Sequence, residues 1–274
     1  MIRIVFRNRF HGYYYKHQKG KKIVCFIPGI SKSGAFIQVI TDNKSYNYNF
    51  NNASFKEKID IGNCCFSKQG INIDLPGIKG NIEYENLTPL KSDIMGIFKF
   101  FPMECRHGVV SMRHNLKGYL IIEEETYDFN DGLGYIEFDK GKSFPKRYVW
   151  IQSNEREDLS IMLSVAHIPF YGINFEGCIC AIIYKGKEYR LATYNGARAD
   201  VLIDKVIITQ GKLRLESYIL NPGRHFILSY PIKGKMSGLI SEHNNSRVRF
   251  KLYHDKELLF DKICENCGYE KHNY

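Results

Sequence analysis

The stretch GYIEFDKGKSFPKRYVWIQSN, residues 134–154, contains two strand-like runs joined by a basic turn with Gly and Pro. The second run holds the only tryptophan of the chain, Trp150, which is followed at two-residue steps by Gln152 and Asn154. Successive side chains of a strand point to opposite faces of the sheet, so these three residues share one face. Because cores consist mainly of apolar side chains, a tryptophan beside two amides indicates a sheet face with a further purpose.

The first run has the same alternation at Tyr135, Glu137 and Asp139. A buried polar group without a partner costs about 1–3 kcal/mol, so these carboxyl groups point inward only if they are satisfied there or serve a ligand. A carboxyl group in an aromatic pocket has a raised pKa and can donate a proton, and aromatic faces stabilise a cation. Two interpretations follow: a pocket equipped to protonate an alkene, or an outward face whose carboxylates pair with the basic residues at 140–147.

The rest of the chain alternates between turn-forming clusters and short apolar or alternating runs. Examples of the clusters are HQKGKK (17–22), SNERED (153–158) and YKGKE (184–188). Many short strands at such spacing are typical of an antiparallel barrel or sandwich, and 19 Tyr with 18 Phe also favour β structure. We therefore predict an all-β protein with a short helical turn around 92–101. The sequence contains no motif of the nucleotide-binding, hydrolase or zincin type.

A loose internal repeat predicts two related β domains. GYYYKH (12–17) and YVWIQSN (148–154) each precede a strand that ends in Ile-Pro, and a hairpin with a tyrosine-rich strand follows. Self-similarity of this kind indicates duplicated architecture. We place the two domains at 1–130 and 131–274.

Composition narrows the functional classes. The 274 residues are enough for one large or two small domains, and the net charge is +10. No aromatic stripe interleaves with the basic residues, so nucleic-acid binding is the least favoured reading and solvated surface charge the best. The sequence has no run of about 18 apolar residues and so predicts no membrane span. The N-terminus lacks the pattern of a signal peptide. We expect a cytoplasmic protein without an integral membrane segment, and peripheral membrane contact stays open.

Eight cysteines are scattered along the chain. Without a secretion signal we expect them to be free, small, buried hydrophobic residues rather than a disulfide framework. Cys264 and Cys267 form one C-x-x-C pair, but a zinc site needs two more ligands, and the nearby histidines have no recognised spacing. An incidental pair is therefore favoured over a metal site.

Two further segments carry candidate site residues. His107 and His114 are seven residues apart, which places them on opposite faces of a strand and argues against a shared metal. A single histidine such as His107 is either a proton shuttle in a cavity or a structural residue bonded to the backbone. In the segment 190–202, Arg198 either orients an anionic or phenolic ligand or lies at the surface.

Several of these segments resemble the tocopherol cyclase family. SFPKRYVWIQSN (143–154) resembles its F-P-[KR]-x-[WY]-x-W-x-Q-x-N signature, and GYYYK (12–16) resembles its early G-W-Y-F-[KR] strand. PMECRHGVVSM (102–112) and the segment 184–201 resemble further family elements, although Tyr194 replaces the tryptophan of a W-N-G element. The resemblance covers most of the chain. It also relates the chain in architecture to carotenoid hydratase-like and lipocalin-like Diels–Alderase proteins.

The resemblance implies two lipocalin-like β-barrel domains that enclose an apolar pocket, with no cofactor and no metal. The implied partner is a hydrophobic small molecule of the isoprenoid or prenylated-quinol class, because the plant enzymes protonate a prenyl double bond and let the phenol oxygen trap the cation. In this chain Glu137 or Asp139 is the expected acid, with His107 assisting proton transfer. The expected ligand-contacting residues are Tyr14, Tyr135, Trp150, Gln152, Asn154, Tyr194, Asn195 and Arg198. The alternative is a non-catalytic binder or carrier of a hydrophobic metabolite.

Overall fold

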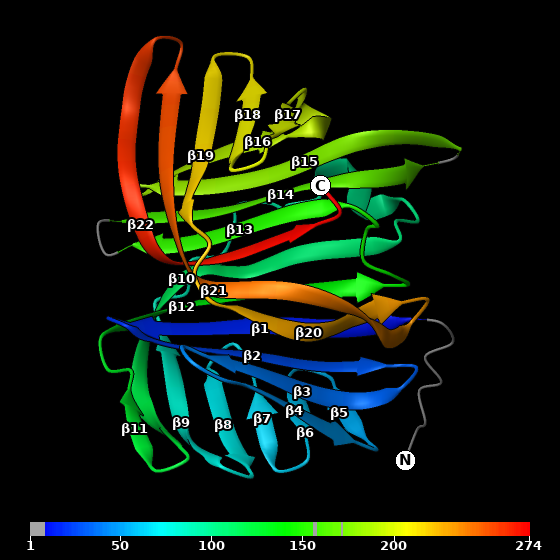
Figure 1. Ribbon diagram of the computed structural model, residues 1–274, viewed down its shortest axis with the longest axis vertical. Helices are drawn as coiled ribbons and strands as arrows, with labels where there is room; N and C mark the ends of the chain where they lie inside the picture. The colour runs from blue at the N-terminus through cyan, green and yellow to red at the C-terminus, as the bar shows by residue number, and fades with distance from the viewer. Residues whose placement is uncertain (1–8, 156–157, 171) are drawn as a thin grey trace. The chain divides into compact units, whose positions relative to one another are not determined.

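The computed structural model describes residues 9–155, 158–170 and 172–274 (Figure 1). The first eight residues and part of the predicted SNERED turn lie outside the described residues. The chain forms two compact units, and each unit combines separate parts of the sequence. Unit 1 takes its residues from Met1–Pro89, His107–Ser143 and Ser229–Gly238, and unit 2 from Leu90–Arg106, Phe144–Leu228 and Leu239–Tyr274.

Within the described residues, the secondary structure consists of short and long strands with two short 3₁₀ helices. The strands of the first sheet are β1 (Phe10–Lys19), β2 (Lys22–Ser31), β3 (Gly34–Thr41), β4 (Ser45–Phe50), β5 (Ala53–Phe55), β6 (Ile59–Ile61), β7 (Cys64–Phe66), β8 (Gly70–Leu75), β9 (Ile78–Glu85), β10 (Cys105–Ile122), β11 (Glu125–Asp128) and β12 (Gly132–Gly141). The strands of the second sheet are β13 (Tyr148–Glu155), β14 (Leu159–Phe170), β15 (Ile173–Tyr184), β16 (Lys187–Ala192), β17 (Arg198–Val201), β18 (Lys205–Gln210), β19 (Leu213–Asn221), β20 (His225–Ile232), β21 (Lys235–His254) and β22 (Glu257–His272). The 3₁₀ helices are η1 (Gly96–Phe100) and η2 (Thr193–Asn195).

Both sheets are antiparallel and barrel-like, which confirms the all-β prediction. The first sheet follows the order β4-β3-β2-β1-β12-β10, and the second follows β16-β15-β14-β13-β22-β21 before each continues into its remaining strands. The two orders are equivalent: a four-strand meander is followed by two strands from later in the sequence. This shared order corresponds to the loose repeat in the sequence.

The units divide the chain differently from the division at 130/131 expected from the sequence. Residues 131–143 belong to unit 1, because β12 pairs with β1 along its length, from Phe10 opposite Gly141 to Gln18 opposite Leu133. Residues 90–106 belong to unit 2.

Strands β1 and β12 of unit 1 are buried on both faces. Tyr15 and Ile136 point into the apolar core of the unit. On the opposite face, Tyr14 lies directly across from Glu137, and the two residues are only 8% and 5% exposed. The outward-facing interpretation of the stretch around Tyr135 is therefore wrong, because this polar face is buried as well.

The core of unit 1 also contains two neutral histidines. The His17 Nδ1 donates to a backbone carbonyl, so its Nε2 accepts the hydrogen bond from the Tyr84 hydroxyl at 2.6 Å. The Ser111 hydroxyl donates to a backbone carbonyl and so accepts from His114 Nδ1 at 3.2 Å. Both histidines therefore carry their proton on Nδ1, and both are almost completely buried.

The sheet of unit 2 has the same two-faced construction at β13. Val149 and Ile151 pack in the apolar core. Trp150, Gln152 and Asn154 point to the other face and are also buried, with at most 5% of their surface exposed.

The predicted turns and the short helical segment are present. Gly20, in the β1–β2 turn, has a φ of 57°, a left-handed conformation that glycine adopts without steric cost. The helical turn expected within 92–101 is η1, a 3₁₀ helix.

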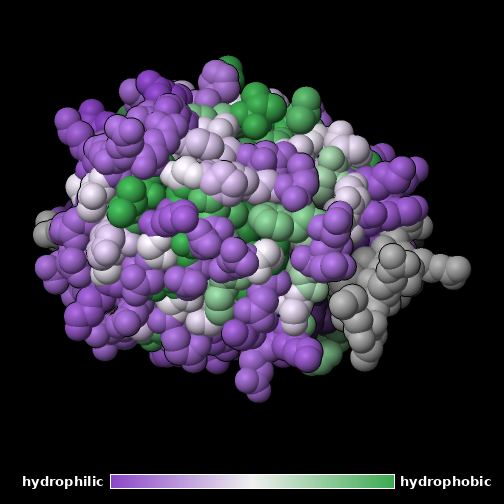
Figure 2. Space-filling view, turned by 90° about the horizontal axis from the view of Figure 1, so that it is seen from below, coloured by the Kyte–Doolittle hydropathy of each residue, from purple (hydrophilic) through white to green (hydrophobic). Residues whose placement is uncertain are grey.

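The charged surface is largely solvated and locally paired. Exposed ion pairs join Lys19 to Asp128 and Lys212 to Asp255, and such pairs add little to stability. The face shown in Figure 2 is predominantly hydrophilic, with hydrophobic side chains in small separate areas. Among the described residues, no helix has both the length and the apolar character that crossing a membrane requires.

Candidate functional site

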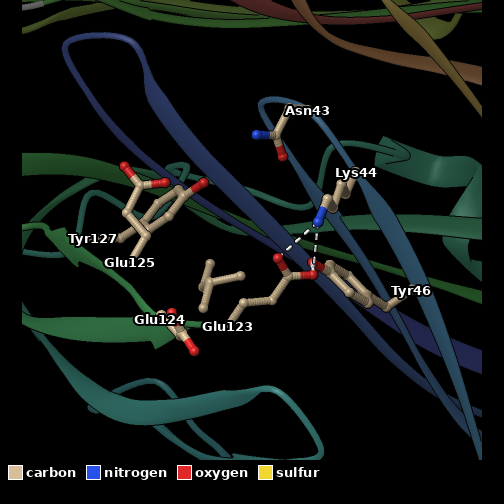
Figure 3. A pocket seen from close by; sticks show the side chains of 8 residues that line it. Asn43, Lys44, Tyr46, Glu123, Glu124, Glu125 and Tyr127 are labelled. Carbon is tan, nitrogen blue, oxygen red and sulfur yellow. Dashed lines mark hydrogen bonds and ion pairs between the residues drawn. The ribbon is translucent and has the colours of Figure 1, made fainter.

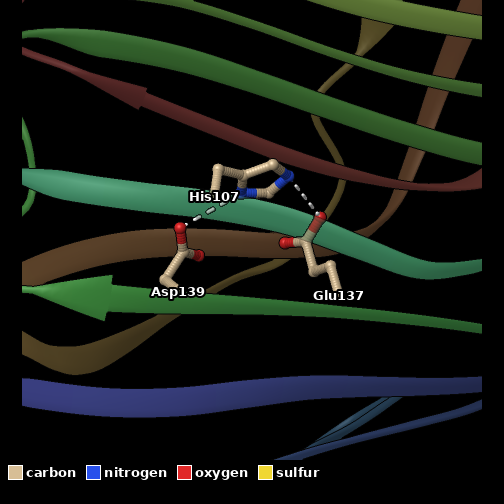
Figure 4. A group of neighbouring side chains, drawn as sticks. All are labelled: His107, Glu137 and Asp139. Atoms are coloured by element: carbon tan, nitrogen blue, oxygen red, sulfur yellow. Dashed lines mark hydrogen bonds and ion pairs between the residues drawn. The ribbon is translucent and has the colours of Figure 1, made fainter. Parts of the chain in front are cut away.

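The three residues expected to handle protons lie together in unit 1 (Figure 4). His107 projects from β10, and Glu137 and Asp139 project from β12, the neighbouring strand of the sheet. The His107 Nδ1 lies 3.1 Å from Asp139 Oδ1, and its Nε2 lies 3.3 Å from Glu137 Oε2. The imidazole therefore bridges the two carboxyl groups, and we call these three residues the proton group.

The electrostatics of this arrangement place a proton on the histidine. Desolvation by burial lowers the pKa of His107, but the charges of Glu137 and Asp139 and their hydrogen bonds outweigh it. The pKa of His107 is raised well above its ordinary value of 6.5. An imidazolium ion carries an N–H on each ring nitrogen; here Nδ1 hydrogen-bonds to Asp139 and Nε2 forms an ion-pair contact with Glu137.

Tyr135 completes the hydrogen bonding of Glu137. Its hydroxyl donates to Glu137 Oε2 at 2.5 Å, so this oxygen faces both the tyrosine and the imidazolium. Burial, reinforced by the charge of Glu137, raises the pKa of Tyr135 well above 10. The phenol therefore keeps its proton and serves as a fixed donor.

Strand β1, the other neighbour of β12 in the sheet, extends the same face. Tyr14 lies across from Glu137, and its hydroxyl is 3.1 Å from Cys25 Sγ. Lys16 lies across from Tyr135 and is only 1% exposed. A fully buried lysine is rare, and the sequence reasoning missed it. The signal was available, because Lys16 shares the two-residue alternation of Tyr14.

The backbone leaves room for a β-carbon beside Asp139. Gly12 lies across from Asp139 in the β1–β12 pairing. A β-carbon placed on Gly12 would have the carbonyl oxygen of Pro28, at 3.9 Å, as its neighbour. By contrast, the corresponding position on Gly29, the partner of Gly12 in β2, is filled by the ring of Phe36. Asp139 is also the more open carboxyl group, with 22% of its side chain exposed against 7% for Glu137.

The proton group is also the set of described residues with donor atoms close enough to surround a metal ion, all within 4.8 Å of one another. A nitrogen that binds a metal must be unprotonated, and its other ring nitrogen normally donates to a carboxylate. Here each ring nitrogen faces a carboxylate. The geometry therefore fits an imidazolium better than a metal ligand.

The remaining predicted residues lie in unit 2. Trp150, Gln152 and Asn154 share one face of β13, as the alternation predicted. Trp150 lies opposite Glu270 of β22, and Tyr148 donates to Glu270 Oε2 at 2.6 Å. The sequence reasoning did not single out Glu270, which comes from the end of the chain.

Around η2 the predicted residues have different surroundings. The Tyr194 hydroxyl accepts from Arg190 at 3.1 Å and lies 3.1 Å from the carbonyl oxygen of Ile94, to which it donates. Asn195 and Arg198 are exposed. Tyr194 thus holds a loop of its own unit, and ligand contact by Asn195 and Arg198 stays a prediction.

The structure also contains a hollow of about 560 Å³ in unit 1 (Figure 3). It is lined by Asn43, Lys44, Tyr46, Ile122, Glu123, Glu124, Glu125 and Tyr127. Lys44 forms an ion pair with Glu123 across it. The lining contains none of the predicted site residues, and its charged character does not fit a hydrophobic ligand.

The comparisons with known proteins identify the fold. No protein-family model and no curated protein sequence matches the chain. Among solved structures, CghA crystallised with Sch210972 has a TM-score of 0.66 at 9% identity, covering 96% of this chain and 88% of CghA. CghA crystallised alone gives 0.64 with the same identity and coverage. A protein of Nitrosomonas europaea assigned as AttH (NE1406) gives 0.57 at 9% identity, covering 97% of this chain and 93% of that protein. The chain has a lipocalin-like fold of two β units.

Proposed function

We propose that the protein binds a hydrophobic small molecule of the isoprenoid or prenylated-quinol class and protonates its double bond with the proton group. The observation that carries this proposal is the imidazole of His107, clamped between Glu137 and Asp139 on a buried sheet face. A buried charge lowers stability unless it is paired. The imidazolium of His107 is paired with two carboxylates, so the arrangement fits a group that holds a proton for transfer.

The proposed reaction is an isomerisation in which the proton group gives up one proton and regains one. His107 passes a proton to Asp139, which presents it to the less substituted alkene carbon. The phenol oxygen of the ligand then forms a C–O bond with the cationic carbon, and the phenolic proton returns to the proton group. The alkene π bond and the phenolic O–H bond break, and a C–H and a C–O bond form. The reaction therefore consumes no oxidant and needs no co-reactant. Water in place of the phenol oxygen gives hydration instead.

The surroundings support this assignment of roles. Asp139 is the more exposed carboxyl group and lies across from Gly12, which has no side chain, so we assign it proton delivery. Glu137, held by Tyr135, keeps the imidazole oriented. The ring of Tyr14, across from Glu137, is the proposed wall for the cation. For unit 2, ligand contact by Trp150, Gln152 and Asn154 stays a separate prediction.

The second candidate is a carrier that binds the same class of molecule without changing it. The lack of a side chain at Gly12, beside Asp139, supports binding independently of any chemistry. The crystal structure of CghA with Sch210972 supports the idea that this fold accommodates a small molecule. A ligand that co-purifies unchanged would distinguish a carrier from an enzyme.

The first experiment is mass spectrometry of small molecules extracted from the purified protein, followed by turnover assays on a panel of prenylated quinols. We expect cyclised product with the unmodified protein and at least a hundredfold slower turnover with Asp139→Asn or His107→Gln, because general acid catalysis contributes about 10²–10⁴-fold. His254→Gln, at an exposed position, is the matched control and should leave turnover unchanged. Full turnover in Asp139→Asn would refute the assignment of the acid.

A size-filling variant tests the binding step separately. Gly12→Leu adds a side chain beside Asp139, at a position where a β-carbon makes only an ordinary contact with the Pro28 carbonyl oxygen, so it should exclude the ligand there. We expect loss of the co-purified molecule with little change in the urea midpoint. Retained ligand at normal occupancy would show that the molecule binds elsewhere.

A further inference from the structure

A short loop of unit 2 presents large apolar side chains to solvent. In η1 and directly after it, the side chains of Ile97, Phe100 and Phe101 are 58%, 78% and 42% exposed. Pro102, the next residue, is exposed as well. Singly exposed apolar residues are common, but several in one short segment indicate an interaction site.

The loop is anchored, so the exposure is not a result of loose packing. Ile94 and Met95 are buried, and the Phe98 ring contacts the ring of Tyr194 at 6.4 Å between centroids. Arg190 donates to the carbonyl oxygen of Asp93 at 3.2 Å. The apolar tip therefore projects from a fixed base.

The charges around the tip are predominantly basic. The Lys99 ammonium lies 4.9 Å from the centre of the Phe100 ring, and Lys91 is exposed. Arg106 and Asp93 form an ion pair with each other at 2.9 Å. Glu188, which accepts from the Lys91 backbone N–H, forms an ion pair with Arg190. Two lysines thus remain against one acidic residue, Glu104, and the whole chain carries a charge of +10.

We infer that the segment 97–102, which we call the η1 tip, docks on the surface of a lipid membrane that contains anionic lipids. Aromatic and aliphatic side chains enter the boundary between headgroups and acyl chains, while neighbouring lysines stay among the phosphates. This inference goes beyond the proposed function and does not depend on the proton group. It gives the protein access to apolar molecules that are dissolved in a membrane.

The test is co-sedimentation with vesicles of phosphatidylcholine alone and of phosphatidylcholine with 30% phosphatidylserine, a share chosen as roughly that of an anionic leaflet. We expect binding to the anionic vesicles, weakened by added salt. The Ile97→Ser/Phe100→Ser variant should bind at least about tenfold more weakly, since burying one such side chain contributes about 1.5–3 kcal/mol. The matched control is Ile227→Ser/Leu239→Ser, which removes apolar side chains that are 56% and 68% exposed on β20 and β21 of the same chain. Its binding should equal that of the unmodified protein.

Three results would overturn the inference. The unmodified protein could fail to bind either vesicle, or both double variants could bind equally well. Alternatively, sedimentation velocity without lipid could show a dimer that Ile97→Ser/Phe100→Ser abolishes. The η1 tip would then bind a second copy of the chain instead of a membrane. Emission from Trp150 verifies that each variant is folded. Because the assay contains no prenylated quinol, its failure leaves the proposed chemistry unaffected.

Discussion

Acidification from pH 7 to pH 5 should destabilise unit 1 through its two buried histidines. Burial lowers the pKa of His17 to about 4, and burial with the nearby His17 lowers the pKa of His114 to about 3. In the unfolded chain both titrate near 6.5. The unfolded state therefore binds more protons below pH 6.5, so the stabilisation is complete above that pH and is lost as the pH falls.

The magnitude follows from these pKa values. Each histidine contributes a loss of about 2 kcal/mol between pH 7 and pH 5, which gives about 4 kcal/mol for the pair. His107 acts in the opposite direction, because its raised pKa makes the folded state the better proton acceptor. His11 of the same unit, whose pKa burial also lowers to about 4, adds to the loss. The loss from the buried pair alone is a large share of the 5–15 kcal/mol that stabilises a typical domain.

Urea unfolding followed by far-UV circular dichroism at pH 7, 6 and 5 measures this loss. Trp150 emission reports on unit 2 in the same samples, because unit 1 contains no tryptophan. Replacement of both histidines by glutamine should lower stability at pH 7 but flatten its dependence on pH. Nitrogen-15 NMR of the native protein provides the decisive check. If either ring of the histidine pair titrates near pH 6.5 in the folded protein, the reasoning is refuted.

Three substitutions test other parts of the structure. Gly134→Ala would place a β-carbon 2.1 Å from the His114 Nε2, so we expect a loss of about 1–3 kcal/mol in urea unfolding, and an unchanged midpoint would contradict this packing. Tyr135→Phe removes the donor to Glu137 and should cost about 1.5–3 kcal/mol in the same measurement, because the acceptor is a buried carboxylate. Glu137→Gln removes one of the two charges facing His107 and should lower the pKa of that imidazole, as followed by NMR; an unchanged titration would show that the carboxylate does not hold the proton there.

The sequence was sufficient for features that depend on local periodicity. The two-residue alternation correctly placed Tyr135, Glu137 and Asp139 on one face, and it did the same for Trp150 with its two amide neighbours. It also placed His107 and His114 in different surroundings: His107 contacts Glu137, whereas His114 packs against Tyr84. Clusters of glycine and polar residues likewise predicted where most strands end, because these residues have definite backbone preferences.

Features that depend on pairing between distant strands could not be predicted. The sequence named His107 as a candidate, but only the pairing of β10 with β12 brings its ring between two carboxyl groups. Periodicity also could not decide whether the face with Glu137 is buried, because alternation separates two faces without saying what covers each. The role of Tyr194 in holding the η1 loop depends on contacts of the same non-local kind.

The interleaving of the two units imposes an order on folding during synthesis. Unit 1 includes Ser229–Gly238, and this segment is tied to it by backbone hydrogen bonds, such as that from Lys32 to Gly234. The ribosome needs roughly 4–17 s to extend the chain from residue 143 to residue 229 at about 5–20 residues per second. During that interval unit 1 lacks its last segment, while the residues of unit 2 emerge beside it. The newly made chain must therefore remain partly folded and free of aggregation for seconds, and a single cut in the gene cannot separate two complete units.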